Sequence, residues 1–451
     1  METFENLFST ETLEALYKHN ISAKASKGID RVSPYAFYRD HKTIISNISK
    51  KVLTGRYTFT PYLEHLYTKG RSQCPRLISV PTIRDKITLT ALNIYLQSKF
   101  PNFVNRIIPN QRIRKIHKAL TQYSGETSLQ IGRTDIENFY ASIDRKMLLD
   151  KIEKAIHPLA QNLLLSAINN PTVPKWHSRS DRQLYTTTSG IPQGIPISSI
   201  LAEIYISDVD STLKEETLFF DRYVDDIIFI SDNWKASQHS LEECLSKLQL
   251  SVNRDKTTSG LPSQCFNYLG YSICNGSILI KKSSFERQIR IINNLFISYK
   301  KDRYIASRKP DSKKFETITD NFIEDLNIRL AGSYHDNKRY GCVFYYSEIT
   351  DTSQLYQIDA FVSKQLKKTP HISPSRIKSA ARAFHNIKAG NSESYSHKFN
   401  HLTPLDMIEY LTKRGAVDTE TPLTPFEIQQ KYFRYINKRL KGLEEDMGIV
   451  Y

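Results

Sequence analysis

Two acidic residues stand side by side at the edge of an apolar run in the stretch RYVDDIIFIS, residues 222–231. The β-branched residues that follow favour a strand, and Val224, Asp225 and Asp226 are expected to form the bend that leads into it. A third acid, Asp135, ends a second strand-like stretch, IGRTDIENFYASID (131–144). If these strands lie side by side in one sheet, three carboxylates from distant parts of the chain converge at its edge.

Three carboxylates at short range repel one another, which raises their pKa values and costs free energy unless a cation neutralises them. Oxygen ligands of this kind favour Mg²⁺ or Mn²⁺. Two such ions ~4 Å apart can stabilise both the attacking and the leaving oxygen of an in-line phosphoryl transfer. A lone Asp-Asp pair is more often a turn or a helix cap, so the metal hypothesis depends on the motifs that accompany these acids.

The composition indicates a globular chain with a polyanionic partner. Lysines and arginines number 63 against 47 aspartates and glutamates, a formal charge of +16 over 451 residues. Such a balance favours nucleic acid, although some proteins are merely basic. We expect no membrane association and a cytoplasmic location, because no run approaches the ~20 apolar residues of a membrane helix and the N-terminus does not resemble a signal peptide. The five cysteines are scattered without a CxxC pair, so we expect reduced thiols rather than a zinc site or disulfides.

The hydrophobic pattern predicts an α+β fold. The β-α-β-β-α-β order, with one antiparallel hairpin, suits a ferredoxin-like sheet. The Gly/Pro loop at 189–198 opens a helix that Ser198 or Ser199 would cap, and most of 283–451 reads as helical. Helices are expected at 1–22, 41–56, 84–99, 147–156, 198–213 and 240–250, and strands within 61–82, from 131, within 222–231 and at 266–273.

Ordered motifs accompany the acids along the chain. They are KGIDRVS (27–33), PRLISVPTIRDKI (75–87), DIENFY (135–140), SGIPQGIPIS (189–198), YVDD (223–226), LSVNRDKT (250–257) and FNYLGYSI (266–273). Over residues 24–275 this set resembles the core of a reverse transcriptase, and the first two motifs resemble the fingers of bacterial group II intron and retron enzymes. One departure is the glycine loop, which reads Pro192-Gln193-Gly194 and so displaces the family's first glycine.

The resemblance implies a right-hand polymerase that copies RNA into DNA. Its partners would be an RNA template, deoxynucleoside triphosphates and the DNA product, and homo-oligomers could form. In the thumb, Phe296 and Tyr299 would pack inward while basic residues follow a phosphate backbone. The expected domains are an N-terminal helix (1–23), fingers and palm (24–275), a helical thumb-like region (276–340) and an α-helical C-terminal domain that binds RNA or another subunit (341–451).

The family's catalytic roles transfer to matching positions. Asp135, Asp225 and Asp226 would hold two Mg²⁺ ions, or Mn²⁺, with the Ile136 carbonyl assisting. Lys256 would protonate the departing pyrophosphate, or would instead be a solvated lysine after a turn.

Substrate contacts are implied at further positions. Tyr140 would fill the space that a ribose 2′-hydroxyl needs, unless it is only a core aromatic. Gln193 and Gly194 would contact the nucleotide and template. Arg76 and Arg84 would clasp the triphosphate through their guanidinium forks, although Arg84 could instead be a surface charge at the start of a helix.

Beyond the core, residues 327–362 resemble a segment of bacterial defence-associated and abortive-infection reverse transcriptases. That likeness implies antiviral (phage) defence, with a partner noncoding RNA as template. Two other functions stay open: a template-independent deoxynucleotidyl transferase that uses the same site, and a non-catalytic RNA-binding scaffold. The hydroxyl of Tyr451 could prime synthesis, but the primer, the template and the oligomeric state stay open.

Overall fold

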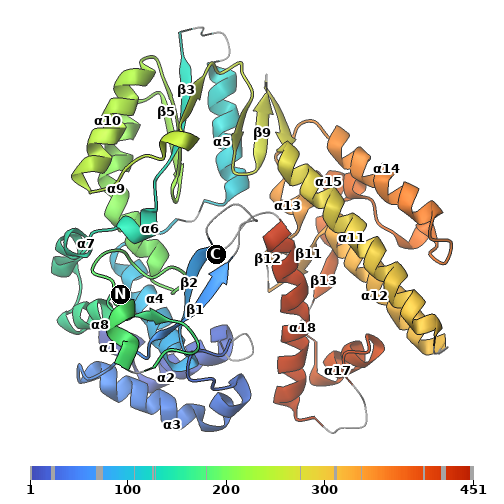
Figure 1. Cartoon of the computed structure of the whole chain (residues 1–451), viewed down its shortest axis with the longest axis horizontal. Coiled ribbons are helices and arrows are strands. Elements are labelled where there is room, and N and C mark those ends of the chain that lie inside the picture. Colours follow the sequence, from blue (N-terminus) through green and yellow to red (C-terminus); the bar gives the residue numbers. More distant parts are fainter. Residues whose placement is uncertain are drawn as a thin grey trace. The chain divides into compact units, whose positions relative to one another are not determined.

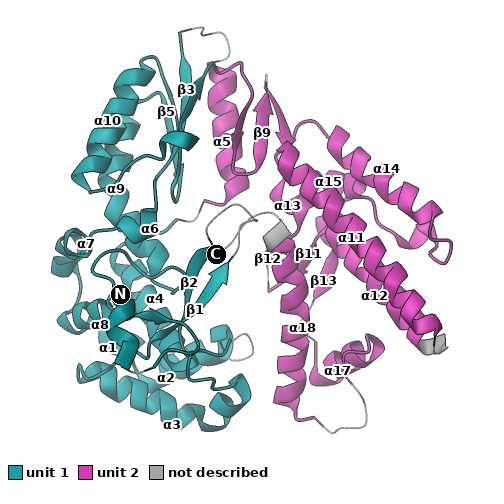
Figure 2. Ribbon diagram, in the orientation of Figure 1, with its two compact units in different colours: residues 1–106, 126–261 teal, residues 107–125, 262–451 magenta. Residues whose placement is uncertain are grey.

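The computed structural model divides the chain into two compact units, which are described one at a time (Figure 2). Unit 1 comprises residues 1–106 and 126–261, and unit 2 comprises 107–125 and 262–451. Among the described residues, no helix combines the length and the apolar character needed to cross a membrane. The structure describes residues 3–21, 26–67, 75–105, 107–123, 126, 128–178, 180–274, 276–308, 312–336, 338–399, 402–417 and 423–446.

A four-stranded antiparallel sheet, with strand order β5-β6-β3-β7, forms the palm in unit 1. Along the chain, helix α9 precedes the β5–β6 hairpin and α10 follows it, which confirms the predicted ferredoxin-like order (Figure 1). The residues of β6 from Ile227 to Ser231 are all buried. Gly132 permits close packing, since a Cβ there would overlap the rings of Phe229 and Trp234. The bounds are β3 (Gln130–Asp135), β5 (Phe219–Tyr223), β6 (Asp226–Ser231), β7 (Thr258–Gly260), α9 (Ser198–Glu216) and α10 (Trp234–Lys247).

A smaller sheet, with strand order β2-β1-β4, forms the fingers. Strands β1 and β2 pair antiparallel, as expected within residues 61–82, and β4 joins β1 in parallel. Helix α4 begins directly after Thr82, whose side chain accepts a hydrogen bond from the Asp85 N–H. The bounds are β1 (Tyr62–Tyr67), β2 (Arg76–Val80), β4 (Thr172–Val173), α3 (Pro34–Leu53), α4 (Ile83–Lys99), α6 (Phe139–Ser142), α7 (Arg145–Ile152) and α8 (Pro158–Ile168).

Three local predictions for unit 1 need correction. The single helix expected over 1–22 is broken into α1 (Phe4–Leu7), α2 (Thr10–Leu16) and a π-helical turn, because Ser9 caps a new helix. Helix α3 begins at Pro34 rather than at residue 41, because Ser33 caps it and proline suits the first turn. Ser198 and Ser199 do not cap α9; the Ser198 hydroxyl donates instead to the Pro192 carbonyl at 2.6 Å, which ties the helix to the preceding loop.

Unit 2 begins with helix α5 (Pro109–Gln122) and a three-stranded sheet, β10-β9-β8. The stretch FNYLGYSI is a hairpin rather than the single strand expected, because Leu269 and Gly270 adopt positive φ angles of 47° and 80° and reverse the chain. A disulfide joins Cys265 to Cys274 across this hairpin, which corrects the expectation of reduced thiols for these two residues. The strands are β8 (Phe266–Tyr268), β9 (Tyr271–Cys274) and β10 (Ser277–Ile280).

The rest of unit 2 is largely helical, as expected. Phe296 and Tyr299 are buried on α11 and contact Phe322 on α12, with ring centroids 5.0 and 4.5 Å apart. One feature was not predicted: a small sheet with strand order β12-β11-β13. The bounds are α11 (Lys282–Ser307), α12 (Ser312–Ala331), β11 (Ser333–His335), β12 (Lys338–Tyr340), α13 (Cys342–Tyr345), α14 (Ser353–Lys367), α15 (Ala380–Lys388), α16 (Ser392–Tyr395), β13 (His397–Phe399), α17 (Pro404–Lys413) and α18 (Pro425–Asp446).

Candidate active site

The three acids lie together at one end of the palm sheet. The antiparallel register of β3 and β6 places Asp135 directly opposite Asp226. The N–H of Ile136 donates to the carbonyl of Asp225 at 2.9 Å, so the third acid adjoins the same two strands. Val224, at φ 59°, and Asp225 form the turn between β5 and β6. Pairing of two strands, rather than nearness in sequence, therefore brings these carboxylates together.

A basic side chain faces each acid. Arg133 lies two residues before Asp135 on β3, hence on the same face of the strand, and donates from Nε and Nη2 to both carboxylate oxygens of Asp226 at 2.9 Å. Lys256 forms an ion pair with Asp135, and Nη2 of Arg76 lies 4.0 Å from Oδ2 of Asp225.

Even with these basic partners, two of the three acids have raised pKa values. Burial raises the pKa of Asp225, and the neighbouring charge of Asp135 raises it further. Burial also raises the pKa of Asp226, even though the Arg133 ion pair opposes the shift. Both shifts mean that the ionised carboxylates are less stable here than in water, so an added cation would be favourable.

The donor chemistry of the acids suits a hard divalent cation. In the part of the chain that the structure describes, no group of three or more His, Cys, Asp or Glu side chains is arranged to hold a metal ion. The oxygens of Asp226 and Asp135 are bonded to Arg133 and Lys256 instead. Carboxylates on adjacent strands, with two raised pKa values, nevertheless form the oxygen-only set that Mg²⁺ and Mn²⁺ prefer. Binding would require these two basic side chains to release carboxylate oxygens.

Tyr140 lies beside this cluster. Its ring is half-buried, and its carbonyl accepts a hydrogen bond from the Ile191 N–H at 2.9 Å. Burial, and then the charges of Glu203 and Asp225, raise the pKa of Tyr140 to about 12. The side chain is therefore a neutral phenol within electrostatic reach of an active-site acid.

The glycine loop packs on the fingers strand that carries Arg76. The Gln193 carbonyl accepts a hydrogen bond from the Ser79 N–H at 2.7 Å. Gly194 has a φ of 93°, and a Cβ there would lie 2.6 Å from the Ile78 side chain, so a larger residue would strain the loop. The structure thus gathers Gln193, Gly194 and Arg76 around one strand, β2.

Arg84 is engaged elsewhere. On the second residue of α4, its guanidinium binds the buried carboxylate of Asp85 at 3.0 Å, the Thr58 carbonyl at 2.9 Å and the Thr60 hydroxyl at 3.0 Å. The central guanidinium carbon of Arg84 also lies 5.1 Å from the centroid of the Tyr57 ring. These contacts engage the Arg84 guanidinium at the start of α4, and they leave Arg76 as the fingers arginine beside the acids. A triphosphate contact by Arg84 stays a prediction.

Sequence reasoning missed Arg222, which anchors the acidic turn. Its side chain is only 2% exposed. It binds Asp210 through Nε and Nη2, both at 2.7 Å, binds Glu203 through Nη2 at 2.6 Å, and donates from Nη1 to the Val224 carbonyl at 2.8 Å. Burial alone would lower the pKa of Arg222, but the two carboxylates outweigh burial and raise it. A charged residue inside a strand next to the acid pair was the available signal, because a buried arginine needs carboxylate partners.

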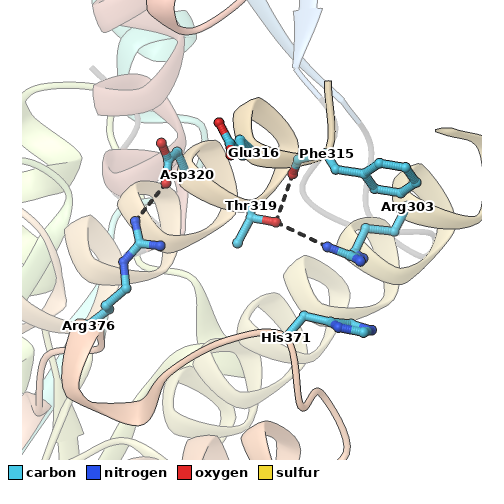
Figure 3. A pocket seen from close by; sticks show the side chains of 7 residues that line it. All are labelled: Arg303, Phe315, Glu316, Thr319, Asp320, His371 and Arg376. Carbon is cyan, nitrogen blue, oxygen red and sulfur yellow. Dashed lines mark hydrogen bonds and ion pairs between the residues drawn. The ribbon is translucent and has the colours of Figure 1, made fainter. Parts of the chain in front are cut away.

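A separate cavity of about 410 Å³ lies in unit 2. Figure 3 shows acids and bases intermixed around it, with Arg376 bound to Asp320 at 2.6 Å and Arg303 bound to the Thr319 hydroxyl at 3.3 Å. None of the acids of the palm lines it, so it is no part of the candidate active site. Its lining residues are Arg303, Phe315, Glu316, Thr319, Asp320, His371 and Arg376.

Several solved structures are similar to the chain. Telomerase from Candida albicans, in complex with a TWJ fragment of telomeric RNA, aligns over 91% of this chain and 67% of its own, with 12% identity and a TM-score of 0.44. Apo telomerase from Candida tropicalis aligns over 91% of this chain and 69% of its own, with 13% identity and a TM-score of 0.41.

Sequence comparisons relate part of the chain to known proteins. The group II intron-encoded protein LtrA of Lactococcus lactis subsp. cremoris is 27% identical over 184 residues, which are 40% of this chain; the chain spans only 29% of LtrA. The protein YkfC of Escherichia coli (strain K12) is 22% identical over 59% of this chain and 79% of its own length. A family model described as reverse transcriptase (RNA-dependent DNA polymerase) matches residues 68–273, which include all three acids. Residues 68–273 therefore form a reverse transcriptase domain, and the chain is similar to a group II intron-encoded protein.

Proposed function

We propose that this protein is an RNA-directed DNA polymerase that extends a primer from deoxynucleoside triphosphates on an RNA template. One observation carries the proposal. The β3–β6 register sets Asp135 opposite Asp226, with Asp225 adjoining them, inside the matched reverse transcriptase domain. Three converging carboxylates suit phosphoryl transfer, which needs divalent cations, and burial raises the pKa of two of them, Asp225 and Asp226. A scaffold that only bound RNA would not need these carboxylates.

The residues of the site would have distinct roles in this reaction. Asp135, Asp225 and Asp226, with the Ile136 carbonyl, would hold two Mg²⁺ ions, or Mn²⁺. Bound there, the cations would supply Lewis-acid activation of the primer 3′-hydroxyl and neutralise charge on the pyrophosphate.

The chain's own side chains do the rest. Arg76, 39% exposed and 4.0 Å from Asp225, is free to bind triphosphate oxygens. Lys256, 58% exposed, would move from Asp135 to the leaving pyrophosphate and donate a proton there. The half-buried ring of Tyr140 would occupy the space beside the sugar and exclude a 2′-hydroxyl.

The test is primer extension by the variant Asp225→Asn/Asp226→Asn. We expect loss of deoxynucleotide incorporation with an unchanged circular dichroism spectrum, because the amides keep the shape but lose the charge that binds cations. Asp208→Asn, at a side chain 74% exposed on α9, is the matched control and should extend normally. Extension by the double variant at the wild-type rate would refute the proposal. Wild-type extension that persists with one nucleotide and no RNA would instead indicate a template-independent transferase.

The biological setting is a further part of the proposal. The likeness of residues 327–362 to defence-associated enzymes supports a role in phage defence with a partner noncoding RNA. Sequencing the nucleic acid that copurifies with the protein would identify template and product together, and a heterogeneous RNA pool would contradict a dedicated template. The domain boundaries at 23, 275 and 340, the cytoplasmic location and self-association stay predictions, and Tyr451 lies outside the described residues.

A further inference from the structure

Arg145 is the first residue of α7, and every N–H of its guanidinium donates a hydrogen bond, mostly to the glycine loop and the residues just before it. Nε donates to the Gly190 carbonyl at 2.7 Å, and Nη2 donates to the Thr187 hydroxyl at 2.7 Å and to the Ser189 carbonyl at 3.1 Å. Nη1 donates to the Thr187 carbonyl and to Oδ1 of Asn169, the latter at 2.9 Å. None of these acceptors is charged, and all but one belong to the segment 187–190.

This arrangement is not what helix formation alone would select. A cation at the first residue of a helix stands at the positive end of the helix dipole, where it is unfavourable. Burial lowers the pKa of Arg145, because no carboxylate offsets the loss of water. The hydrogen bonds to segment 187–190 must outweigh both the unfavourable helix dipole and the burial of the charge. Arg145 therefore holds this segment, although a cation at this position destabilises the helix.

The clamped segment in turn positions the backbone around Tyr140. The Gly190 N–H donates to the Ile143 carbonyl at 2.8 Å, and the Ile191 N–H donates to the Tyr140 carbonyl at 2.9 Å. Gly190 has a φ of 75°, and a Cβ there would lie 2.6 Å from the Ala141 carbonyl oxygen. The backbone of the glycine loop and the backbone that follows Tyr140 are therefore in close contact. Arg145 thus connects the start of α7 to both the glycine loop and the backbone of Tyr140.

We propose that Arg145 is a positioning residue that sets the discrimination between deoxyribonucleotides and ribonucleotides. This inference rests on the proposed function, since it concerns the same nucleotide site. A steric gate excludes a single oxygen atom, so a small shift of the Tyr140 backbone opens the space that the gate should fill. Lysine cannot replace arginine here, because its ammonium has three donors on a single nitrogen and cannot reach acceptors spread around a planar fork.

The first experiment measures kcat/KM for a deoxynucleotide and for the matching ribonucleotide with Arg145→Lys and Arg145→Gln. Tyr140→Ala is the positive control, and Arg182→Gln, on the exposed turn just before the clamped segment, is the matched control. We expect the preference for deoxynucleotides to fall about 10- to 100-fold in both Arg145 variants, the size of effect that a displacement near 1 Å has at a reacting centre. An equal loss of rate for both nucleotides, with the preference unchanged, would show a merely structural role and overturn the inference.

The second experiment does not depend on activity. Hydrogen–deuterium exchange should become faster at the amides of Gly190 and Ile191 in Arg145→Lys, while the exchange of palm strand β6 stays at the wild-type rate. Unchanged exchange at Gly190 and Ile191 would refute the clamp even if the wild-type protein incorporated no nucleotide. Absence of incorporation by wild type would in that case count against the proposed function alone.

Discussion

Replacing Arg222 by methionine should destabilise unit 1 strongly. Methionine has a similar length and suits a buried site, so it removes the charge and the hydrogen bonds while largely filling the space. Glu203 and Asp210, 14% and 21% exposed, would then be left as partly buried carboxylates without their partner. The turn at Val224 would also lose the donor that holds its carbonyl.

The magnitude follows from the burial of the pair. Removing one member of a buried ion pair costs about 3–5 kcal/mol, because the remaining charge stays desolvated. A unit of this size moves its thermal midpoint by about 2–4 °C per kcal/mol, so we expect Arg222→Met to melt roughly 6–20 °C below wild type. Deoxynucleotide incorporation should fall as well, since the turn carries Asp225.

Thermal unfolding followed by circular dichroism measures the effect. Arg114→Met is the matched control, because Arg114 pairs with Glu348 at 2.6 Å but is 70% exposed; an exposed pair of this kind contributes about 0–1 kcal/mol. Adding Glu203→Gln and Asp210→Asn to Arg222→Met should recover stability, because neutral amides cost less to bury than carboxylates. The reasoning is refuted if Arg222→Met has the same melting temperature as the Arg114→Met control. It is also refuted if the triple variant has a melting temperature no higher than that of Arg222→Met.

Two further predictions concern single residues. Lys256→Ala should lower the single-turnover rate of nucleotide incorporation by about 10²-fold or more, as expected for loss of a general acid; an unchanged rate would leave Lys256 as a solvated lysine. His397 is half-buried, with Nε2 3.3 Å from Oε1 of Glu324. Partial burial together with the charges of Lys378, Arg414 and Arg439 lowers its pKa from 6.5 to about 4. Below pH 6.5 the unfolded chain therefore binds a proton that the folded chain does not, and the free energy of unfolding should fall by up to about 3 kcal/mol towards pH 4. Urea titrations at several pH values would check this, and a slope that survives His397→Gln would assign the pH dependence to other groups.

The palm could be predicted because its signals are local. The β-branched run after Asp226 and the bend at Val224 indicate a hairpin within a few residues of chain. Helical periodicity located α3 and α10 with errors at their ends, where the capping residues Ser33 and Asn233 decide the start. The hairpin at Leu269 and Gly270 was missed, because an apolar run with one glycine has the same pattern as a continuous strand.

The partners of Arg145 and Arg222 could not be predicted. Arg145 binds residues more than forty positions along the chain, and Arg222 binds Glu203 and Asp210 on a helix. Nothing in the spacing of charges identifies the partners of either arginine. These residues become neighbours only in the packed structure, where Arg222 is 2% exposed and Arg145 is half-buried.

The amino-acid sequence by itself determined the chemical inventory: three carboxylates at the ends of strands, an aromatic five residues after Asp135, and a glycine-rich loop before a helix. These follow from residue type and from periods of two and 3.6, which act over short distances. Tertiary structure alone decided that Asp135 faces Asp226, that Arg133 rather than solvent neutralises Asp226, and that Arg145 donates to the Gly190 carbonyl of the glycine loop. The physical reason is that electrostatic and hydrogen-bond partners are selected by distance and desolvation, and both are properties of the folded chain.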